Sequence, residues 1–563
     1  MKFYTLTFLL LCNLICSAQE KYPRDYFAPP LKIPIVLSGT FGELRSNHFH
    51  SGIDIKTQGK EGIPIYAPAD GFVSRIKIGQ YGFGKALYMK HPNGYTTVYA
   101  HLQKFEPSLE EYIKAAQYKK QKYAVGNLFP DTLQFAFKKG ELLGYTGDTG
   151  SSGGPHLHYE IRDSKTEHII NPLLFGITPK DNLKPTMRKV IVYPLSADAT
   201  INNTHQKTSL ELKEISTGNF ITNRIEAAGT IGFGVSVFDQ LNGAANKNGI
   251  FSLEMKVNGS RVYYHDVETF SFSESKYINL LIDYAHYKRY KQRFQKTHKF
   301  DNNKLSLYKD LINDGKLEAV AQTSYNVEII AKDINGNEAR IKIPIKGVTS
   351  KQNFQANDST NYKIIATKFA KFSKENVTIA FPKNTFYEDQ YIDFKVNNGL
   401  IQVHNTTIPL DKRYTLTIGT ERLNAAQKNH VYIANVTNAK YPRYVATKKK
   451  ENKVYTSTKA LGDYKLMFDY EAPEIALLNF YDGQWISNNK TLKVKIKDSE
   501  SGIKNYRATL DNKWILMELN HKKGILTYNF KDKPLVGSKH IFNIVVSDNA
   551  GNTKTLKATF YKK

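Results

Sequence analysis

Residues 154–160, GPHLHYE, place two of the chain's fifteen histidines one residue apart. A β-strand points residues i and i+2 to the same side, so His156 and His158 can present both imidazoles to one site. An isolated pair of this kind is also compatible with a surface strand that carries two solvated histidines. The pair therefore marks a candidate site, and the rest of the sequence has to decide between these interpretations.

The N-terminus and the cysteines indicate where the protein works. Residues 1–18 run from Lys2 through an apolar stretch to small residues, which predicts a cleaved export signal. Lipidation is the weaker alternative, because Ile15 stands before Cys16 where a small residue is needed. The chain's two cysteines both lie in this signal, so the mature protein has no thiol nucleophile and no disulfide. We expect an exported protein of the periplasm or cell envelope, or a secreted one, without a transmembrane segment.

The composition is strongly basic. The chain has 79 Lys and Arg against 52 Asp and Glu, a formal net charge of +27. Such a surface favours polyanionic partners such as cell-wall polymers or lipid headgroups, although a lysine-rich proteome explains the charge equally well. Because the chain is predicted to be exported, we expect no nucleic-acid partner.

The chain is too long for one hydrophobic core, since a domain usually takes about 150 residues. Residues 19–38 form a proline-broken leader. From residue 39 to 175, short alternating apolar runs are separated by glycines, which predicts an antiparallel β domain. Residues 108–121 instead have helical spacing, with Ser108 as the expected N-cap. The predicted fold class is mainly β.

Two later segments resemble each other. Gly249-Ile250 leads into a segment that closes with KDINGN and a return strand, and Gly502-Ile503 leads into one that closes with SDNAGN and a return strand. A strand that ends in Asp, followed by a tight turn, is typical of a β-sandwich hairpin. We predict Ig-like sandwiches at residues 186–348 and 471–563, with a further β module at residues 362–470.

The first of these sandwiches contains a helical insertion around residues 278–296. Its interleaved Tyr and Lys or Arg side chains are compatible with a face that binds a polymer. The pattern favours an amphipathic helix that packs on its own sandwich.

Two familiar motifs are discounted. Residues 79–86, GQYGFGKA, nearly match a phosphate-binding loop, but Ala86 replaces the required hydroxyl and the flanks are strands. Residues 150–154, GSSGG, fit G-x-S-x-G, yet Pro155 and a strand follow Ser152 where a nucleophile elbow needs a helix.

Residues 48–56, HFHSGIDIK, supply the partners of the histidine pair. His50 and Asp54 flank Gly52, which indicates a turn that can aim both side chains at one ion. A catalytic zinc site uses three protein ligands of N, O or S type and keeps one open position. Without thiols, two histidines and one carboxylate are the natural set, and His50, Asp54 and one histidine of the pair provide it.

Four blocks in order resemble the lysostaphin-like, or LytM-type, zinc endopeptidases of peptidase family M23: HSGIDI, PIYAPADGFV, YAHL and GYTGDTGSSGGPHLHYEIR. The resemblance covers residues 39–175 and implies a LytM-type peptidase domain that binds Zn²⁺. By that resemblance the zinc ligands are His50, Asp54 and His158. The catalytic histidines beside the metal are His101, from YAHL, and His156. Which of the two acts as the base is left open.

The leading hypothesis is a zinc-dependent endopeptidase that hydrolyses the peptide cross-links of bacterial peptidoglycan. The alternative is a non-catalytic LytM-type activator or scaffold that regulates other cell-wall hydrolases. Presence of all five functional positions favours the enzyme.

The parts outside the catalytic blocks raise three further expectations. The insertion at residues 105–138 either roofs the cleft or decorates its rim. The C-terminal half shows no clustered acids or histidines at ligand spacing, so we expect it to bind envelope partners and to perform no chemistry. Residues 19–185 are expected to contain a complete site and to fold alone.

Overall fold

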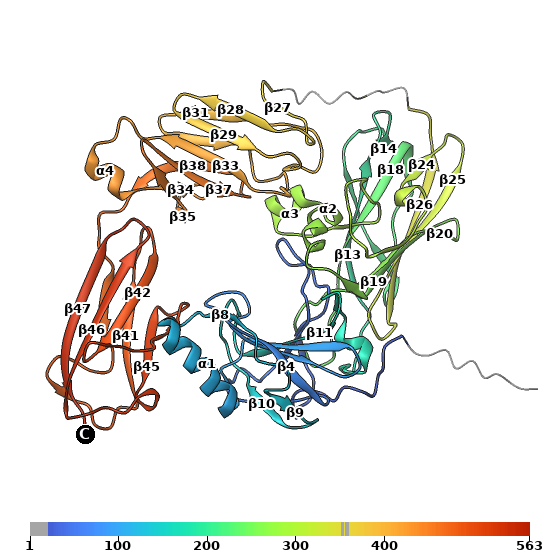
Figure 1. The fold of residues 1–563 in the computed structure, drawn as a ribbon. Coiled ribbons are helices and arrows are strands. Elements are labelled where there is room, and N and C mark those ends of the chain that lie inside the picture. Colours follow the sequence, from blue (N-terminus) through green and yellow to red (C-terminus); the bar gives the residue numbers. More distant parts are fainter. Residues whose placement is uncertain (1–20, 351–353, 355–359) are drawn as a thin grey trace, which may run out of the picture.

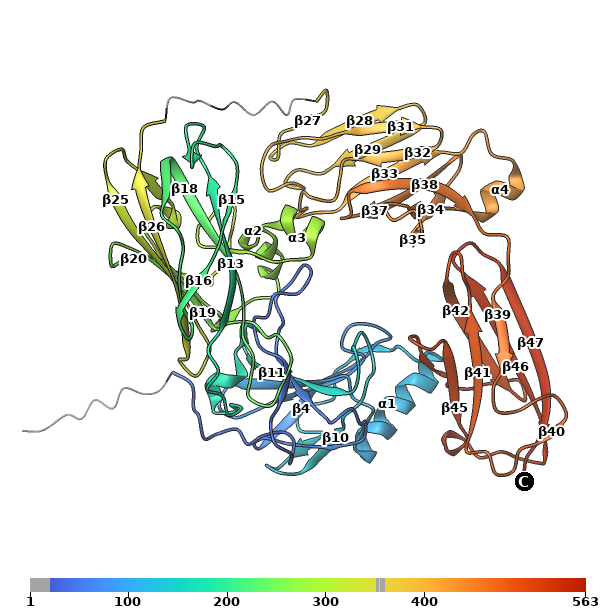
Figure 2. The ribbon, with the colours of Figure 1, turned by 180° about the vertical axis from the view of Figure 1, so that it is seen from behind.

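The computed structural model describes residues 21–350, 354 and 360–563 (Figure 1). The predicted export signal lies outside these residues. Four units follow one another around a ring (Figures 1 and 2). We call them the N-terminal unit (residues 21–177), the first sandwich (186–348), the middle module (360–468) and the second sandwich (474–563). Across the described residues, no helix has the length and apolar character needed to cross a membrane.

The N-terminal unit is built on an antiparallel sheet with the strand order β1-β2-β11-β6-β5-β4-β8. The run GFVSRIKI that the sequence predicts as a strand is β4, and the turn after it joins β4 to β5 as a hairpin. Strands β12 and β9 pair with β11 and β4 at the margins. The bounds are β1 Leu37–Gly39, β2 Ile53–Lys56, β4 Gly71–Ile78, β5 Lys85–Lys90, β6 Tyr95–Ala100, β8 Gly126–Leu128, β9 Ala136–Phe137, β11 His156–Asp163 and β12 Ile169–Ile170.

A small sheet and one helix complete this unit. The small sheet has the order β3-β10-β7, with β3 Pro64–Tyr66, β7 Lys104–Phe105 and β10 Leu142–Tyr145, and η1 spans Pro172–Phe175. The predicted helix is α1, Pro107–Lys120, but Ser108 as its N-cap is wrong. The side chain of Glu106 accepts from Leu109 N at 2.7 Å and from Ser108 N at 3.1 Å. Pro107 fixes the first helical position, so the cap lies one residue before it.

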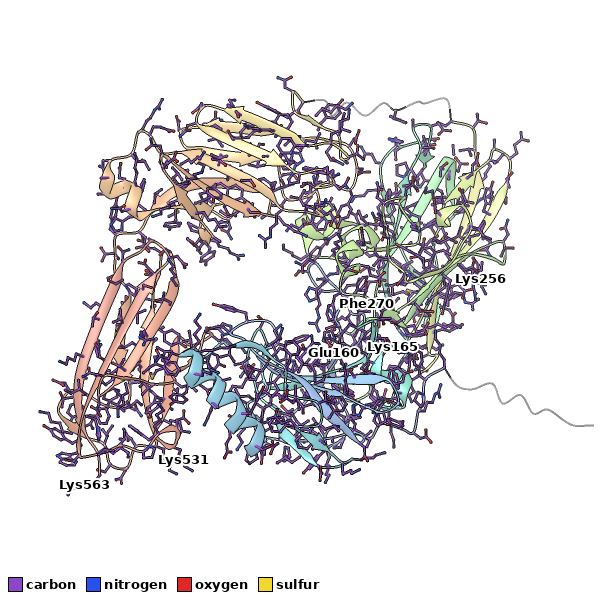
Figure 3. The ribbon with its side chains drawn as sticks, viewed as in Figure 1. Glu160, Lys165, Lys256, Phe270, Lys531 and Lys563 are labelled. Carbon is purple, nitrogen blue, oxygen red and sulfur yellow. The ribbon has the colours of Figure 1, made fainter. Side chains whose placement is uncertain are left out.

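The core of the N-terminal unit is not confined to residues 39–175. The predicted leader is packed rather than loose, since Phe27 and Leu31 are buried in this core. From the other side, Phe270 of the first sandwich contacts the rings of Phe41 and Phe49 at 4.9 and 5.3 Å. Figure 3 labels Phe270 where the two units meet. A fragment that ends at residue 185 would expose these rings, which would lower its stability. That such a fragment folds alone stays a prediction.

The first sandwich has the strand order β15-β13-β18-β26-β25-β19-β20-β23. This sandwich has its own hydrophobic core, which includes Val190, Phe233 and Ile341. The bounds are β13 Thr186–Pro194, β14 Thr200–Ile201, β15 Thr208–Leu210, β16 Lys213–Ser216, β17 Asn219–Ile221, β18 Ile225–Phe238, β19 Ser252–Val257, β20 Ser260–Asp266, β21 Thr269–Phe270, β22 Gln295–Lys296, β23 Tyr308–Leu311, η3 Asn313–Gly315, β24 Leu317–Ala319, β25 Ser324–Lys332 and β26 Glu338–Gly347.

The insertion predicted as one helix at residues 278–296 is broken into short pieces: η2 Ser275–Tyr277, α2 Ile278–Leu281 and α3 Tyr284–Tyr290. The break falls at Asp283, whose side chain caps α3 by accepting from His286 N at 3.0 Å. Ile278 and Leu281 are buried in the core of the N-terminal unit. The prediction that the insertion packs on its own sandwich is therefore wrong for α2, which joins two units.

The middle module consists of two facing sheets, with the orders β28-β29-β33-β37-β36 and β31-β32-β38-β34-β35, and the small pair β27-β30. Its core lies between them. The bounds are β27 Lys363–Ile364, β28 Ala370–Lys374, β29 Val377–Phe381, β30 Gln390–Tyr391, β31 Phe394–Asn397, β32 Leu400–Val403, β33 Tyr414–Gly419, α4 Ala425–His430, β34 Val431–Asn435, β35 Arg443–Val445, β36 Lys448–Lys450, β37 Lys453–Thr458 and β38 Gly462–Phe468.

The second sandwich has the sheets β39-β41-β45-β44 and β40-β47-β46-β42-β43. The order β47-β46-β42 repeats the order β26-β25-β19 of the first sandwich, as the sequence repeat predicts. The bounds are β39 Glu474–Leu477, β40 Gln484–Trp485, β41 Thr491–Lys497, β42 Ile503–Leu510, β43 Lys513–Trp514, β44 Glu518–Asn520, β45 Ile525–Asn529, η4 Phe530–Asp532, β46 Lys539–Asp548 and β47 Thr553–Tyr561. The chain is mainly β, which confirms the predicted fold class.

The second sandwich closes the ring by docking on α1 (Figure 2). Lys114 Nζ lies 2.6 Å from Asp532 Oδ1, and the rings of Tyr118 and Trp514 are 5.2 Å apart. Residues on the other face of α1, including Leu109, are buried in the N-terminal unit. The insertion at residues 105–138 thus provides a docking surface for the second sandwich. The sequence interpretations, a roof over the cleft or a decoration of its rim, did not include this role.

Candidate metal centre

The strand order brings together three segments that are far apart in the sequence. Strand β11 lies between β2 and β6. In this register His158 stands opposite Asp54 on one side and Ala100, the residue before His101, on the other. Gly52 permits the close approach of the turn before β2, because a Cβ there would lie 2.4 Å from the Tyr159 carbonyl oxygen.

The three predicted metal ligands converge on one point. His50 Nε2 lies 3.0 Å from Asp54 Oδ1 and 3.1 Å from His158 Nδ1. His158 Nδ1 lies 2.9 Å from Asp54 Oδ1. All three side chains are largely buried. The sequence prediction named these residues together, and the fold places them together.

The outer nitrogens of both imidazoles are already engaged. His50 Nδ1 donates to the carbonyl oxygen of Thr40 at 2.8 Å, and His158 Nε2 donates to Glu160 Oε1 at 3.0 Å. In the neutral form each ring therefore keeps its proton on the outer nitrogen. The lone pairs of His50 Nε2 and His158 Nδ1 then face each other and the Asp54 carboxylate. This donor set suits a cation such as Zn²⁺, which takes histidine and carboxylate ligands held by outer hydrogen bonds.

The charges of the cluster agree with a cation site. Burial alone would raise the pKa of Asp54, but His50 and hydrogen bonds from His156 and His158 hold it well below its usual range. Burial alone would lower the pKa of His158, but the carboxylates of Asp54 and Glu160 raise it to about 9. The carboxylates of Asp54 and Glu160 therefore stabilise a positive charge at this point. A bound metal ion would supply that charge in place of the proton on His158.

Glu160 and Arg162 support the cluster from behind, and sequence reasoning missed both. The Glu160 side chain is fully buried and accepts from Arg162 Nε at 2.7 Å. Burial would raise the pKa of Glu160, but Arg162 and then His158 lower it to about 2. The signal was available, because residues 156, 158, 160 and 162 share one face of the same strand. Figure 3 labels Glu160 on the sheet of the N-terminal unit.

His101 and His156 lie beside the three converging donors. Their ring centroids are 4.9 Å apart, and His156 Nε2 lies 3.4 Å from Asp54 Oδ1. His101 Nδ1 donates to the Thr149 carbonyl oxygen at 2.8 Å, and His156 Nδ1 donates to the Gly154 carbonyl oxygen at 2.8 Å. In its neutral form each ring therefore carries its proton on Nδ1 and leaves Nε2 free to accept a proton.

The position of His101 is unusual for a residue with a side chain. Its φ of 63° lies in the left-handed region, and its backbone N–H donates to the Phe83 carbonyl oxygen at 3.0 Å. Burial, together with the charges of the neighbouring His158 and His156, lowers the pKa of His101 to about 3. The imidazole is therefore neutral at pH 7, the form that accepts a proton.

Comparisons with known proteins agree with this geometry. Residues 48–121 match the model of Peptidase family M23, and residues 361–469 match that of a Zu5-like domain. An uncharacterized metalloprotease of Haemophilus influenzae is 34% identical over 22% of this chain and 20% of its own. The DD-carboxypeptidase/endopeptidase Mpg of Neisseria meningitidis is 35% identical over 21% of each chain. The chain thus spans about a fifth of the length of these relatives.

Among solved structures, the catalytic domain of the prophage-encoded M23 protein EnpA from Enterococcus faecalis is 25% identical, with a TM-score of 0.20. That match covers 27% of this chain and 98% of the other. The matched segment of this chain contains His50, Asp54 and His101, and the register of β11 adds His156 and His158 to them. The N-terminal unit thus contains a Peptidase M23 domain, which the family model matches over residues 48–121.

Proposed function

We propose that the protein is an exported, zinc-dependent endopeptidase that hydrolyses the peptide cross-links of peptidoglycan in the bacterial cell envelope. The observation that carries this proposal is the convergence of His50 Nε2, His158 Nδ1 and Asp54 Oδ1, with both outer ring nitrogens already bonded. A relative named as an endopeptidase supports the reaction class. Activation of other hydrolases without cleavage is the second candidate.

His50, Asp54 and His158 would hold the zinc. Zinc bound there would supply Lewis-acid polarisation of the scissile carbonyl and acidification of the attacking water. His101 and His156 accept the proton of that water and return a proton to the leaving amine through Nε2. The carbonyl groups of Thr149 and Gly154 keep both rings in the tautomer that can do this.

A basic pocket supports an anionic substrate. It has a volume of about 1180 Å³ and lies between the N-terminal unit and the second sandwich. Its lining cations include Lys122 from the N-terminal unit and Lys504 and Arg507 from the second sandwich. The pocket adjoins the loop that carries the Thr149 carbonyl, since Lys522 of its wall donates to Asp148 Oδ1 at 2.6 Å. Carboxylates of a peptide strand would be attracted there.

Digestion of purified cross-linked muropeptides tests the proposal. The mature protein with zinc should convert cross-linked dimers into monomers whose masses identify the bond that is cut. Intact dimers, together with stimulation of a separate wall hydrolase, would favour the activator instead.

Glu160→Gln should weaken zinc binding by about 10- to 100-fold, the usual effect of losing a partner that orients a metal ligand. The amide can still accept a hydrogen bond from His158, but it no longer raises the basicity of the ring and leaves the Arg162 cation without its buried partner. Competition with a chelating dye measures the affinity, and circular dichroism checks the fold.

Glu167→Gln is the matched control. Glu167 Oε2 also contacts Arg162, at 2.9 Å, but the Glu167 side chain is 45% exposed. Of these two glutamates, only Glu160 forms a hydrogen bond with His158. The zinc affinity of Glu167→Gln should stay within about twofold of the wild type, since exposed ion pairs contribute little. Unchanged affinity in Glu160→Gln would disprove the orienting role.

A further inference from the structure

Each sandwich carries three aspartates at the end where the preceding unit joins it. In the first sandwich these are Asp181, Asp239 and Asp333, and each offers one oxygen within 4.8 Å of the others. Asp181 lies in the segment before β13, Asp239 follows β18, and Asp333 follows β25. The expectation that the C-terminal half has no clustered acids is therefore wrong, because only the folded sheet ends bring these residues together.

The second sandwich repeats the arrangement with Asp469, Asp498 and Asp548, whose oxygens also lie within 4.8 Å of one another. Asp469 follows β38 of the middle module, Asp498 follows β41, and Asp548 ends β46. In both sandwiches one aspartate comes from the incoming segment and two come from strand ends. Because the same arrangement of three aspartates occurs in both sandwiches, we expect both clusters to have the same role.

The turns DINGN and DNAGN orient one aspartate of each cluster in the same way. Asn337 donates from its backbone N–H to Asp333 Oδ1 at 2.8 Å and from Nδ2 to Oδ2 at 2.7 Å. Asn552 makes the same two bonds to Asp548, at 2.8 and 2.7 Å. Asp548 Oδ1 also accepts from Gly551 N at 2.6 Å. Each carboxylate is thus held in a fixed direction, and the Oδ2 atom of each keeps one lone pair available.

Within the part of the chain that the structure describes, none of the six carboxylates forms an ion pair with Lys, Arg or His. Lys449 interacts with Asp548 only at longer range. Asp239 is only 2% exposed, and among the described residues its Oδ1 has no hydrogen-bond partner. Burial, together with the charges of Asp333 and Asp181, raises the pKa of Asp239 to about 8. A buried carboxylate with like-charged neighbours is costly without a counter-charge.

A neutral side chain provides independent support. Asn248 stands opposite Asp239 in an antiparallel bridge, so the two side chains share one face. It is 2% exposed, and within the described residues neither its amide oxygen nor its amide nitrogen has a partner. A buried amide oxygen next to a carboxylate cluster is a ready-made additional ligand for a hard cation.

We propose that each cluster binds one Ca²⁺ ion, which clamps the sandwich to the unit before it. The donors are oxygens only, which suits Ca²⁺ and not Zn²⁺, and separate loops and strand ends suit its flexible coordination better than the strict octahedron of Mg²⁺. The clamp acts at joints. Gly249, beside Asn248, donates from its N–H to Thr40 Oγ1 of the N-terminal unit at 3.1 Å, and Asp469 N donates to the His430 carbonyl oxygen of the middle module at 3.1 Å.

Equilibrium dialysis of the mature, zinc-loaded protein against radioactive CaCl₂ tests the stoichiometry. The wild type should bind two calcium ions per chain, with dissociation constants of about 10⁻⁵ to 10⁻³ M. Asp333→Asn and Asp548→Asn should each lose one ion, and the double variant should lose both. No bound calcium at about 5 mM CaCl₂, or two ions in the double variant, would overturn the proposal.

Thermal unfolding provides a second test, in which calcium reverses the order of the melting temperatures of a variant and the wild type. In EGTA, Asp239→Asn should melt at the same temperature as the wild type or higher, because it relieves repulsion. In about 5 mM CaCl₂ the wild type should gain a few degrees and this variant should melt below it, since only the wild type binds the ion tightly.

Asp301→Asn, at an exposed position of the same sandwich, should respond to calcium like the wild type. An equal gain from MgCl₂ would disprove the choice of calcium, and an equal gain in Asp239→Asn would disprove the site.

Discussion

His158→Ala should abolish peptide hydrolysis and remove most of the bound zinc, from about one ion per chain in the wild type. His158 lies on the central strand β11, and its Nδ1 is within 3.1 Å of both other donors, so its removal leaves two of the three converging ligands. The rate should fall by at least about 10³-fold, because the Lewis acid contributes several kcal/mol to the barrier. Metal analysis of the purified protein and the muropeptide assay measure the two effects.

The controls separate loss of the ligand from loss of the fold. His168→Ala removes an exposed histidine from the turn after β11 and should keep both zinc and activity. Asp54→Asn preserves the size of the side chain and removes the carboxylate that holds the cluster, so it should also lose zinc. A folded His158→Ala protein with full zinc occupancy would refute the ligand assignment.

The strands of the N-terminal unit could be predicted because alternation is a local property. The run at residues 71–78 is β4 as a whole, although a register shift between Val73 and Arg75 interrupts its alternation. The five site residues could be named because they lie in motif blocks that resemble peptidase family M23, and these blocks lie at or beside β2, β6 and β11. Their catalytic roles stay predictions until the variants are measured.

Alternation does not tell which unit will cover an apolar face. Phe27 in the proline-broken leader and Ile278 in the helical insertion both pack in the core of the N-terminal unit, across a domain boundary drawn from sequence. The aspartate clusters were missed for a related reason. Asp181 and Asp333 are 152 residues apart, and only the completed sheet brings them together. Glu160 was missed although its strand periodicity marked it.

His101→Ala and His156→Ala should each keep zinc and lose roughly 10²- to 10⁴-fold in rate, the range expected for a group that transfers a proton. Neither ring belongs to the three converging donors, so the metal content should stay near one ion per chain. His156 Nε2 lies 3.4 Å from Asp54 Oδ1, and the ring centroid of His101 lies 4.9 Å from that of His156. Loss of zinc in His101→Ala would instead show that this ring holds the metal.

A buried histidine away from the site distinguishes catalysis from packing. His91 is 6% exposed and bonds the Asp70 carbonyl oxygen and Thr97 Oγ1, at 2.9 and 2.8 Å. His91→Ala should lower the melting temperature and leave kcat unchanged. If the two site histidines act in the same proton transfer, the double variant should be little slower than the slower single variant, because groups that work as a unit are not additive. Activity near wild type in either single variant would remove that histidine from the mechanism.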